Sequence, residues 1–438
     1  MTDRCEKYVD SLSRMLQMET ISDYGPYDKT KIYAFHNLLR ELFPKLFSVC
    51  EFENYDGSFL LRWKGKTSEQ PLMFMNHHDV VCADGAWSHP PFGGEIADGK
   101  LWGRGALDTK GGLFAMLQAA EELIEAGYVP AQDIYFESAC TEECDGTGAK
   151  AISDVLEARK LRFYMILDEG GMIAYNPIGV CDCHFAMIGV GEKGCMDLKF
   201  IARSHGGHAS SPPKNSPLVR LAKFVTAVER KRMFPAKMTP TVYEMFTRMG
   251  KHSSGLVGFV LSHARAFGWL LTPLLSMLSP DGAALLRTTM AFTMASGALN
   301  SNAMPQEASV VANMRVSHHQ GQEDSLRRVQ KLAERFDLTM EVTDYGFDPN
   351  VADYRGSAFR QVEAAVEKVF PGIPCAPYVT NSASDLRFMG KLSDQCIRFT
   401  PFIISDQQRE SIHGIDENID LSCLVPAVDF YKLLMRKE

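Results

Sequence analysis

Histidine and carboxylate side chains stand directly after several short apolar runs of this chain. His77 and Asp79 follow the run PLMFM, and Glu142 and Glu143 follow the run DIYFESAC. The same residue types recur as Asp108 in LWGRGALDTKGG, Asp168 in LDEGG and His413 in SIHGIDENI. If these side chains meet, their excess negative charge needs a counter-ion, and imidazole together with carboxylate suits zinc. The residues therefore predict a site for a pair of divalent metals, which polarises a carbonyl group and activates water.

Two of these histidines are adjacent, and the strand geometry separates them. Successive side chains of a strand point to opposite faces. His77 therefore shares a face with Asp79, and His78 takes the other face. Geometry alone does not decide which of the two binds a ligand, because polar residues at a strand end often begin a solvated loop.

The elements that must position these residues alternate between strand and helix from 71 to 190. Apolar residues at helical spacing occupy 113–124, and strand-like runs lie at 133–140 and 162–167. This alternation predicts an α/β fold with a mainly parallel sheet flanked by helices. Ligands bind beyond the carboxyl ends of the strands in such sheets, and the acidic residues and histidines stand at those ends.

A change of pattern near residue 190 predicts an inserted domain. A turn, an alternating strand, a helix-like segment and another strand follow one another within 191–317. We expect a smaller α+β domain there, with the catalytic domain divided into a first part, 1–190, and a second part, 318–438.

Three further patterns are interpreted as structural. The glycines of GVGEKG, 189–194, fit a dinucleotide fingerprint, but that fingerprint requires a following helix and CMDLKFIA predicts a strand. Cys181 and Cys183 lack a second half with zinc spacing and are expected to be core thiols. The apolar stretch 255–277 contains His, Arg and Pro, which favours buried or pocket-lining helices over a membrane span.

The composition limits the partners and the compartment. The chain has 438 residues and a formal net charge of −8. An acidic balance without a basic stripe argues against nucleic acid or a membrane as the main partner. Eleven cysteines with irregular spacing suit a reducing compartment, and the first residues lack a signal-peptide core. We therefore expect a cytoplasmic protein.

Six motifs, in order, resemble one known family. They are HHDVV, WSHPPFGGEIADGKLWGRGALDTKGG, TEECDGTGA, LDEGG, GGHASSP and IHGIDENI. They are similar to the zinc-dependent aminoacylase and carboxypeptidase metallopeptidases, which include acetylornithine deacetylase and succinyl-diaminopimelate desuccinylase. The sequences of these motifs look most like those of the carboxypeptidase S and N-acyl-amino-acid hydrolase branch. The resemblance covers nearly the whole chain and implies that the inserted domain serves as a lid and a dimerisation surface, so a homodimer is one expected state.

The resemblance also implies a role for each residue of the predicted centre. His77 and Asp168 would bind one metal, Glu143 and His413 the other, and Asp108 would bridge both. Glu142 would be the general base, and Asp79 would orient the ring of His77, as metal-bound histidines require. Zn²⁺ is the expected metal, with Co²⁺ or Mn²⁺ as alternatives. A cis peptide bond is expected at Asp108–Thr109.

Residues for the substrate follow from the same resemblance. His208, in GGHASSP, would donate to the carbonyl oxygen. A free carboxylate on the substrate needs a cation or amide donors, for which Arg387 ranks first, Asn302 second and Arg315 third. Ser384, in place of the usual threonine, would hydrogen-bond substrate. The long apolar segment of the insertion would line an acyl pocket or a dimer interface.

These residues predict a di-zinc hydrolase that cleaves an amide bond next to a free carboxylate, in a dipeptide or an N-acyl-amino acid. A non-catalytic binding or scaffold protein that retains the fold is the alternative. A nucleotide-dependent enzyme would rest only on the rejected glycine pattern. The balance between hydrolysis and synthesis is left open.

Overall fold

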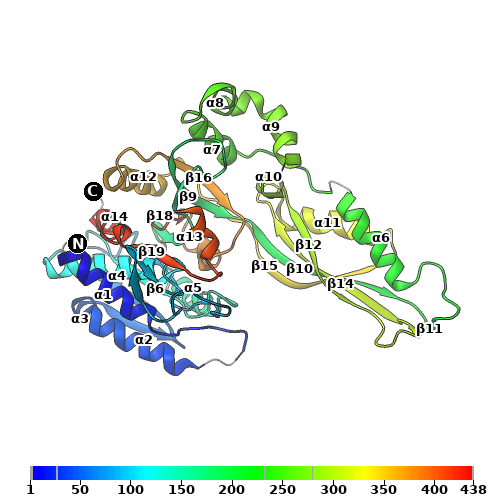
Figure 1. Ribbon diagram of the computed structural model, residues 1–438, viewed down its shortest axis with the longest axis horizontal. Coiled ribbons are helices and arrows are strands. Elements are labelled where there is room, and N and C mark those ends of the chain that lie inside the picture. Colours follow the sequence, from blue (N-terminus) through cyan, green and yellow to red (C-terminus); the bar gives the residue numbers. More distant parts are fainter. Residues whose placement is uncertain (1–2, 26–27, 231–232, 279, 437–438) are drawn as a thin grey trace.

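The protein has two lobes joined by a narrow connection, with both chain ends in the same lobe (Figure 1). The computed structural model describes residues 3–25, 28–230, 233–278 and 280–436. Within these ranges no helix combines the length and the apolar character needed to cross a lipid bilayer.

A ten-stranded mixed sheet forms the centre of the first, catalytic lobe. Neighbouring strands β6, β3, β7 and β17 run parallel, and both faces of this region are covered, which explains their continuous apolar sequences. The predicted α/β fold is confirmed. Along the path of the sheet the strands are β1 (Glu51–Tyr55), β2 (Ser58–Trp63), β6 (Ile134–Ser138), β3 (Leu72–Met75), β7 (Met165–Asp168), β17 (Cys396–Arg398), β9 (His184–Glu192), β8 (Ile173–Tyr175) and β18 (Ile403–Ile404), with β16 (Cys375–Thr380) paired to β9.

Helices cover both faces of this sheet. One face is buried mainly under α1 (Asp3–Leu16), α2 (Lys29–Leu42), α3 (Pro44–Val49), α4 (Lys110–Glu125), α12 (Ser357–Val369) and α14 (Leu424–Arg436). The other face packs against α5 (Thr147–Ala158) and the 3₁₀ helix η1 (Asp385–Lys391). A small sheet of β4 (Glu95–Ala97), β5 (Lys100–Trp102) and β19 (Asn418–Asp420) brings the C-terminal part of the chain beside the segment that leads to Asp108.

The second lobe, the lid, is a four-stranded antiparallel sheet with helices on one face. Its strands, in order, are β12 (Thr289–Ser296), β14 (Glu307–Val316), β10 (Gly194–Arg203) and β15 (Thr339–Phe347), and its helices are α6 (Pro217–Arg230) and α11 (Gly321–Glu334). The predicted boundary at 317 is wrong, because β15 pairs with β10 along most of its length. The lid therefore continues to about residue 347. Gly194 begins β10, so GVGEKG leads into a strand as predicted.

A third group of helices projects between the two lobes (Figure 1). It consists of α7 (Pro240–Gly250), α8 (Gly255–Ser262), α9 (Ala264–Leu278) and α10 (Pro280–Leu286). These helices share an apolar cluster with Phe185 and Met187 of β9 and Ala376 of β16. This helical arm therefore packs on the catalytic lobe, although in sequence it lies inside the lid. It contains the apolar stretch that we expected to form buried or pocket-lining helices.

Candidate metal centre and substrate cavity

The predicted ligands meet at the carboxyl ends of β3, β6 and β7. The Nε2 atom of His77 lies 3.0 Å from Oδ1 of Asp108, and Nε2 of His413 lies 3.0 Å from Oδ2 of the same carboxylate. Glu143 Oε2 is also 3.0 Å from His413 Nε2. Asp108 therefore stands between the two histidines with one oxygen directed at each, as a bridging carboxylate must.

These side chains are suitable ligands for divalent metal ions. One ligand atom each from His77, Asp108 and Glu143 lie within 4.8 Å of one another, and Oε1 of Glu143 is buried without a hydrogen-bond partner in the described structure. Burial, with Asp108 nearby, raises the pKa of Glu143. Hydrogen bonds with Asp108 and then Glu143 raise the pKa of His413 to about 10. A divalent cation stabilises carboxylates that are crowded together in this way, because it supplies the positive charge that they otherwise obtain from protons.

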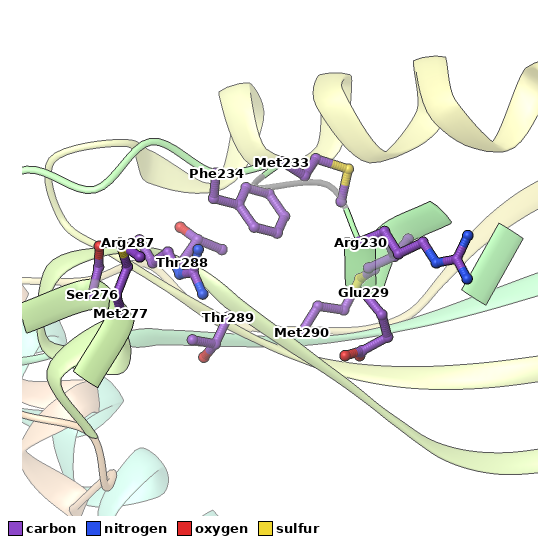
Figure 2. A pocket seen from close by; sticks show the side chains of 11 residues that line it. Glu229, Arg230, Met233, Phe234, Ser276, Met277, Arg287, Thr288, Thr289 and Met290 are labelled. Carbon is purple, nitrogen blue, oxygen red and sulfur yellow. The ribbon is translucent and has the colours of Figure 1, made fainter. Parts of the chain in front are cut away.

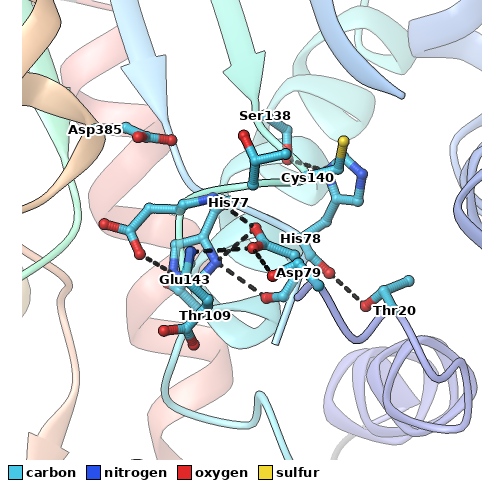
Figure 3. A network of polar contacts seen from close by, with 12 residues as sticks. Thr20, His77, His78, Asp79, Thr109, Ser138, Cys140, Glu143 and Asp385 are labelled. Carbon is cyan, nitrogen blue, oxygen red and sulfur yellow. Dashed lines mark hydrogen bonds and ion pairs between the residues drawn. The ribbon is translucent and has the colours of Figure 1, made fainter. Parts of the chain in front are cut away.

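Asp79 contacts His77 and the backbone at Glu142 and Glu143, and Figure 3 shows it beside His77 and Glu143. Its backbone oxygen lies 3.0 Å from Nδ1 of His77, and its carboxylate accepts hydrogen bonds from the backbone N–H groups of Glu142 at 3.2 Å and Glu143 at 3.0 Å. Ser22 donates a further bond of 2.6 Å to the same carboxylate. Because Nδ1 of His77 is turned toward Asp79, Nε2 is free to face Asp108. This arrangement supports the predicted orienting role.

His78 points away from this centre. Its ring stacks between Phe35 and Phe59, and its Nδ1 lies 2.8 Å from the hydroxyl oxygen of Ser138. Burial, together with the neighbouring charges of His36 and Lys110, lowers the pKa of His78 well below its usual value. His78 is therefore a neutral, packed side chain, and of the two adjacent histidines only His77 faces the centre.

A buried ion pair of Glu417 and Arg104, which the sequence did not predict, holds the segments of two further predicted ligands, Asp108 and His413. Glu417 accepts hydrogen bonds from the backbone N–H groups of Leu107 at 2.8 Å and Asp108 at 3.1 Å. Its partner Arg104, at 2.8 Å, also donates to the carbonyl oxygen of Gly414, the residue after His413. Glu417 is part of the IHGIDENI motif, but only the fold shows that it faces the Asp108 loop. The Asp108–Thr109 peptide bond is cis, as predicted.

The beginning of α4 must pass very close to this loop. A side chain at Gly111 would meet the carbonyl oxygen of Ala106 at 2.2 Å, and one at Gly112 would meet Oδ1 of Asn76 at 2.2 Å. Two consecutive glycines therefore allow the loop of Asp108, the helix and β3 to pack together.

The prediction for Asp168 needs a correction. Its carboxylate accepts a hydrogen bond of 3.1 Å from the backbone N–H of Leu386, on the side of the sheet covered by η1. Glu169, to which the sequence analysis gave no role, lines the same cavity as Asp108, Glu142 and Glu143. Asp168 is the last residue of β7 and does not line this cavity, whereas Glu169 follows in the bend beyond the strand. The structure therefore favours Glu169 over Asp168 as the residue that reaches the centre.

Glu142 lies beside the ligands and borders open space. Its Oε2 is 3.9 Å from Nε2 of His77, and its Oε1 is 3.5 Å from Nη1 of Arg387. Burial, with Asp385 and Glu169 nearby, raises the pKa of Glu142 well above its usual value. Arg387 is itself nearly buried between Glu142 and Asp385.

A cavity of about 850 Å³ opens from the metal centre toward the helical arm. At one end it is lined by Asp108, Glu142, Glu143, Glu169 and His413. Its far wall is apolar and includes side chains from α7, α9 and α10, namely Met245, Phe246, Leu275 and Leu285. Arg409, on α13 (Asp406–Ser411), also lines it and was not predicted.

The residues predicted to bind substrate do not line this cavity. Arg387 lies behind Glu142, and Ser384 is buried with its backbone N–H bonded to Glu192. Arg315 lies on β14 in the lid sheet and donates to Asn313. None of these three side chains lines the cavity beside the metal centre.

His208 and Asn302 meet each other, but far from the metal centre. They lie at the two-stranded antiparallel sheet of β11 (Gly207–His208) and β13 (Ala303–Met304), where Asn302 accepts a backbone bond of 3.0 Å from Ala209. This distal strand pair is at the end of the lid remote from the catalytic lobe (Figure 1). The ten residues of β10, at ~3.3 Å per residue, span roughly 30 Å between the catalytic lobe and this strand pair.

A second cavity, of about 440 Å³, lies within the lid and beside the helical arm. Figure 2 shows its mixed lining, with Phe234 and Met233 above Thr289 and with Arg287 at one side. None of the predicted site residues contributes to it. The larger cavity is therefore the one that combines open space with the predicted chemistry.

The fold and this site together define a hydrolase of the metallopeptidase class. Residues 73–437 match the model of peptidase family M20/M25/M40, and the chain belongs to this family. The predicted family and enzyme class are confirmed.

Curated relatives match over nearly the whole chain. A probable carboxypeptidase S-like 2 from Dictyostelium discoideum is 30% identical, over 97% of this chain and 84% of that protein. An N-fatty-acyl-amino acid synthase/hydrolase, PM20D1.1, from Danio rerio is 30% identical, over 98% and 85%. Among solved structures, an M20 family metallo-carboxypeptidase from Sulfolobus solfataricus has a TM-score of 0.71 at 18% identity, covering 100% of this chain and 99% of that one.

Proposed function

We propose that this protein is a di-zinc hydrolase of N-acyl-amino acids that carry a long apolar acyl group. The cavity of about 850 Å³ supports this proposal, because it has the ligand group at one end and an apolar wall at the other. Such a cavity accepts a substrate whose amide bond lies at the metals and whose acyl chain extends toward the helical arm. The relative from Danio rerio, named as an N-fatty-acyl-amino acid synthase/hydrolase, is consistent with this chemistry.

The contacts among these side chains support the following set of ligands. Asp108 would bridge the two ions, with His77 and Glu169 on one and Glu143 and His413 on the other. Bound zinc would supply a Lewis acid for the amide carbonyl and would lower the pKa of an attacking water.

Glu142 would carry the proton between the two stages of the reaction. Its carboxylate lies 3.9 Å from a metal-binding nitrogen of His77 and borders the cavity, so it can take a proton from water and return it to the leaving amine. Burial raises the pKa of Glu142 above its usual value, which favours acceptance of a proton by its carboxylate.

His208 and Asn302 would act on the substrate from a second copy of the chain. The backbone N–H of Ser210 donates to Nδ1 of His208, so in the neutral ring Nε2 carries the hydrogen and is available to an oxyanion. The lid offers surface for such pairing, since β12 is an edge strand, Met294 on it is 66% exposed and Leu299 is fully exposed.

Arg409 is the guanidinium that we assign to the carboxylate of the substrate. It lines the cavity, and about half of its side chain is exposed beside Asp406. A guanidinium pairs with a carboxylate through two parallel hydrogen bonds. Arg387, in contrast, is nearly buried against Glu142 and Asp385, and is better suited to hold the base in place.

A hydrolysis screen tests the proposal. Purified protein is offered N-acyl-amino acids of increasing acyl length and a set of dipeptides, with and without a chelator. We expect chelator-sensitive turnover that rises with acyl length, and a loss of about 10²–10⁴-fold in Glu142→Gln, as for removal of a general base. Absence of turnover with every substrate would instead favour a binding or scaffold protein.

A further inference from the structure

Two helices of the helical arm, α8 and α9, expose many large apolar side chains. Trp269 is 76% exposed and Leu256 is 77% exposed. The exposed residues on α8 are Leu256, Val257 and Phe259, and those on α9 that do not line the second cavity are Trp269, Leu270 and Leu274. We call these six side chains the arm face. Apolar groups gathered in this way on two adjoining helices mark an interaction surface.

The other side of the same helices is accounted for by packing. Leu261 and Leu271 are buried against α7 in the cluster that includes Phe185 of β9. Leu275 of α9 lines the substrate cavity. One helix, roughly 10 Å across, therefore separates the arm face from the apolar wall of that cavity.

The charge around the arm face differs from that of the whole chain. The chain carries a formal net charge of −8, yet no Asp or Glu occurs between Glu244 and Asp281. Lys251 and Arg265 lie on exposed positions in this stretch. Apolar side chains with cations and without acids are complementary to an anionic lipid surface.

We propose that the arm face docks on the surface of a bilayer that contains anionic phospholipid. Trp269 and the leucines would enter the boundary between headgroups and acyl chains, where tryptophan is favoured. Lys251 and Arg265 would lie at the headgroups. The two helices that carry the arm face, α8 and α9, have 8 and 15 residues, which is too short to span the bilayer.

Docking would give amphiphilic substrates a short path into the cavity. This delivery role rests on the proposed function, whereas the docking itself does not. The acidic balance of the chain led us to expect no membrane partner, but a surface contact depends on the charge that faces the lipid within about a Debye length, ~10 Å.

Vesicle flotation with the full chain tests the docking. The probes are vesicles of phosphatidylcholine mixed with phosphatidylserine and vesicles of phosphatidylcholine alone. We expect binding to the anionic vesicles that weakens with salt. Brominated acyl chains should quench tryptophan fluorescence in the native protein, and this quenching should be lost in Trp269→Phe. Absence of vesicle binding, or quenching that persists in Trp269→Phe, would overturn the proposal.

Paired variants separate docking from folding. Phe259→Glu with Trp269→Glu should lower the vesicle affinity by about tenfold or more per side chain. Val129→Glu changes a side chain that is 52% exposed and lies outside the arm, and it should bind vesicles as the native protein does. Both proteins should keep the native melting temperature and the native rate on a short, soluble N-acyl-amino acid.

Two outcomes distinguish the docking from its alternatives. If the native protein forms a dimer that Phe259→Glu with Trp269→Glu converts to a monomer, without vesicle binding, the arm face joins copies of the chain and docking is wrong. If vesicles bind but no N-acyl-amino acid is hydrolysed, the docking stands and the proposed function fails.

Discussion

The candidate metal centre at the edge of the catalytic lobe and the distal strand pair of the lid hold their polar residues in opposite ways. At the edge, the carboxylate of Asp79 accepts three hydrogen bonds and that of Glu417 is fixed by Arg104 and backbone N–H groups. On the strand pair, His208 is exposed and its ring accepts one hydrogen bond, from the backbone of Ser210.

The difference follows from what each region would have to do. Metal ligands must be held in place before any substrate arrives, since a loose ligand set loses its geometry. A donor that contacts only the bound substrate can be carried on a separate lobe or a second chain. The two regions therefore predict different responses to substitution.

The largest effect is expected at the edge, from the two adjacent histidines. His77→Ala should lose at least one zinc ion per chain and at least about 10³-fold in kcat, because a metal acting as Lewis acid contributes several kcal/mol. His78→Ala should keep its zinc and lower the unfolding free energy by about 3 kcal/mol, as for loss of a large core side chain. Metal analysis and denaturant unfolding measure both. Loss of zinc from His78→Ala alone would reverse the assignment.

The second prediction concerns Glu169 and Asp168. Glu169→Gln should reduce zinc content and lower kcat by about 10³-fold, because it removes a ligand. Asp168→Asn should keep the zinc, since its carboxylate accepts a hydrogen bond from Leu386. Zinc titration of the two variants decides between them, and the opposite result would restore the prediction made from sequence.

The third prediction concerns the distal strand pair. His208→Ala should lower kcat by about 10²–10³-fold, as for removal of an oxyanion donor, with the zinc content unchanged. Mixing His208→Ala with Glu142→Gln should restore about a quarter of the native activity, because half of the dimers are mixed and one site in each is intact. If mixing restores nothing while exchange of subunits is demonstrated, His208 acts within its own chain or not at all.

The smallest effects are expected from changes at Asp79 and at its partner Ser22, of which Asp79→Asn is the larger. This change keeps the shape of the side chain but weakens the bonds to the backbone of Glu142 and Glu143. Loss of a partner that orients ligands typically costs about 10–100-fold in metal affinity or activity. Ser22→Ala removes one of the same bonds and should cost less. A larger loss in Ser22→Ala than in Asp79→Asn would contradict this order.

Much of the edge was predictable because its chemistry is local. His77 and Glu143 follow strands whose apolar sequences mark them, and parallel strands bring their carboxyl ends together. Asp108 and His413 were predicted from the resemblance of their motifs to the family, and the structure brings these four side chains together. The choice between Asp168 and Glu169 failed because it depends on which face of the sheet carries η1.

The lid was harder to predict because its contacts are distant in sequence. β15 completes a sheet whose other strands precede residue 317, so the boundary depended on a pairing across more than a hundred residues. The helical arm lies within the lid in sequence but packs against β9 and β16 of the catalytic lobe. Hydrophobic packing has no direction, and so an apolar run predicts burial without identifying its partner.

The sequence by itself determined the family, the fold class and the residue types of the metal centre. These follow from motifs, from the periodicity of apolar residues and from the ligand preferences of metals. Only the tertiary structure decided that Glu169 rather than Asp168 faces the cavity, that the arm forms its apolar wall, and that His208 lies far from Glu142. Those outcomes depend on how elements distant in sequence pack, and that packing is settled by the surfaces they bury together.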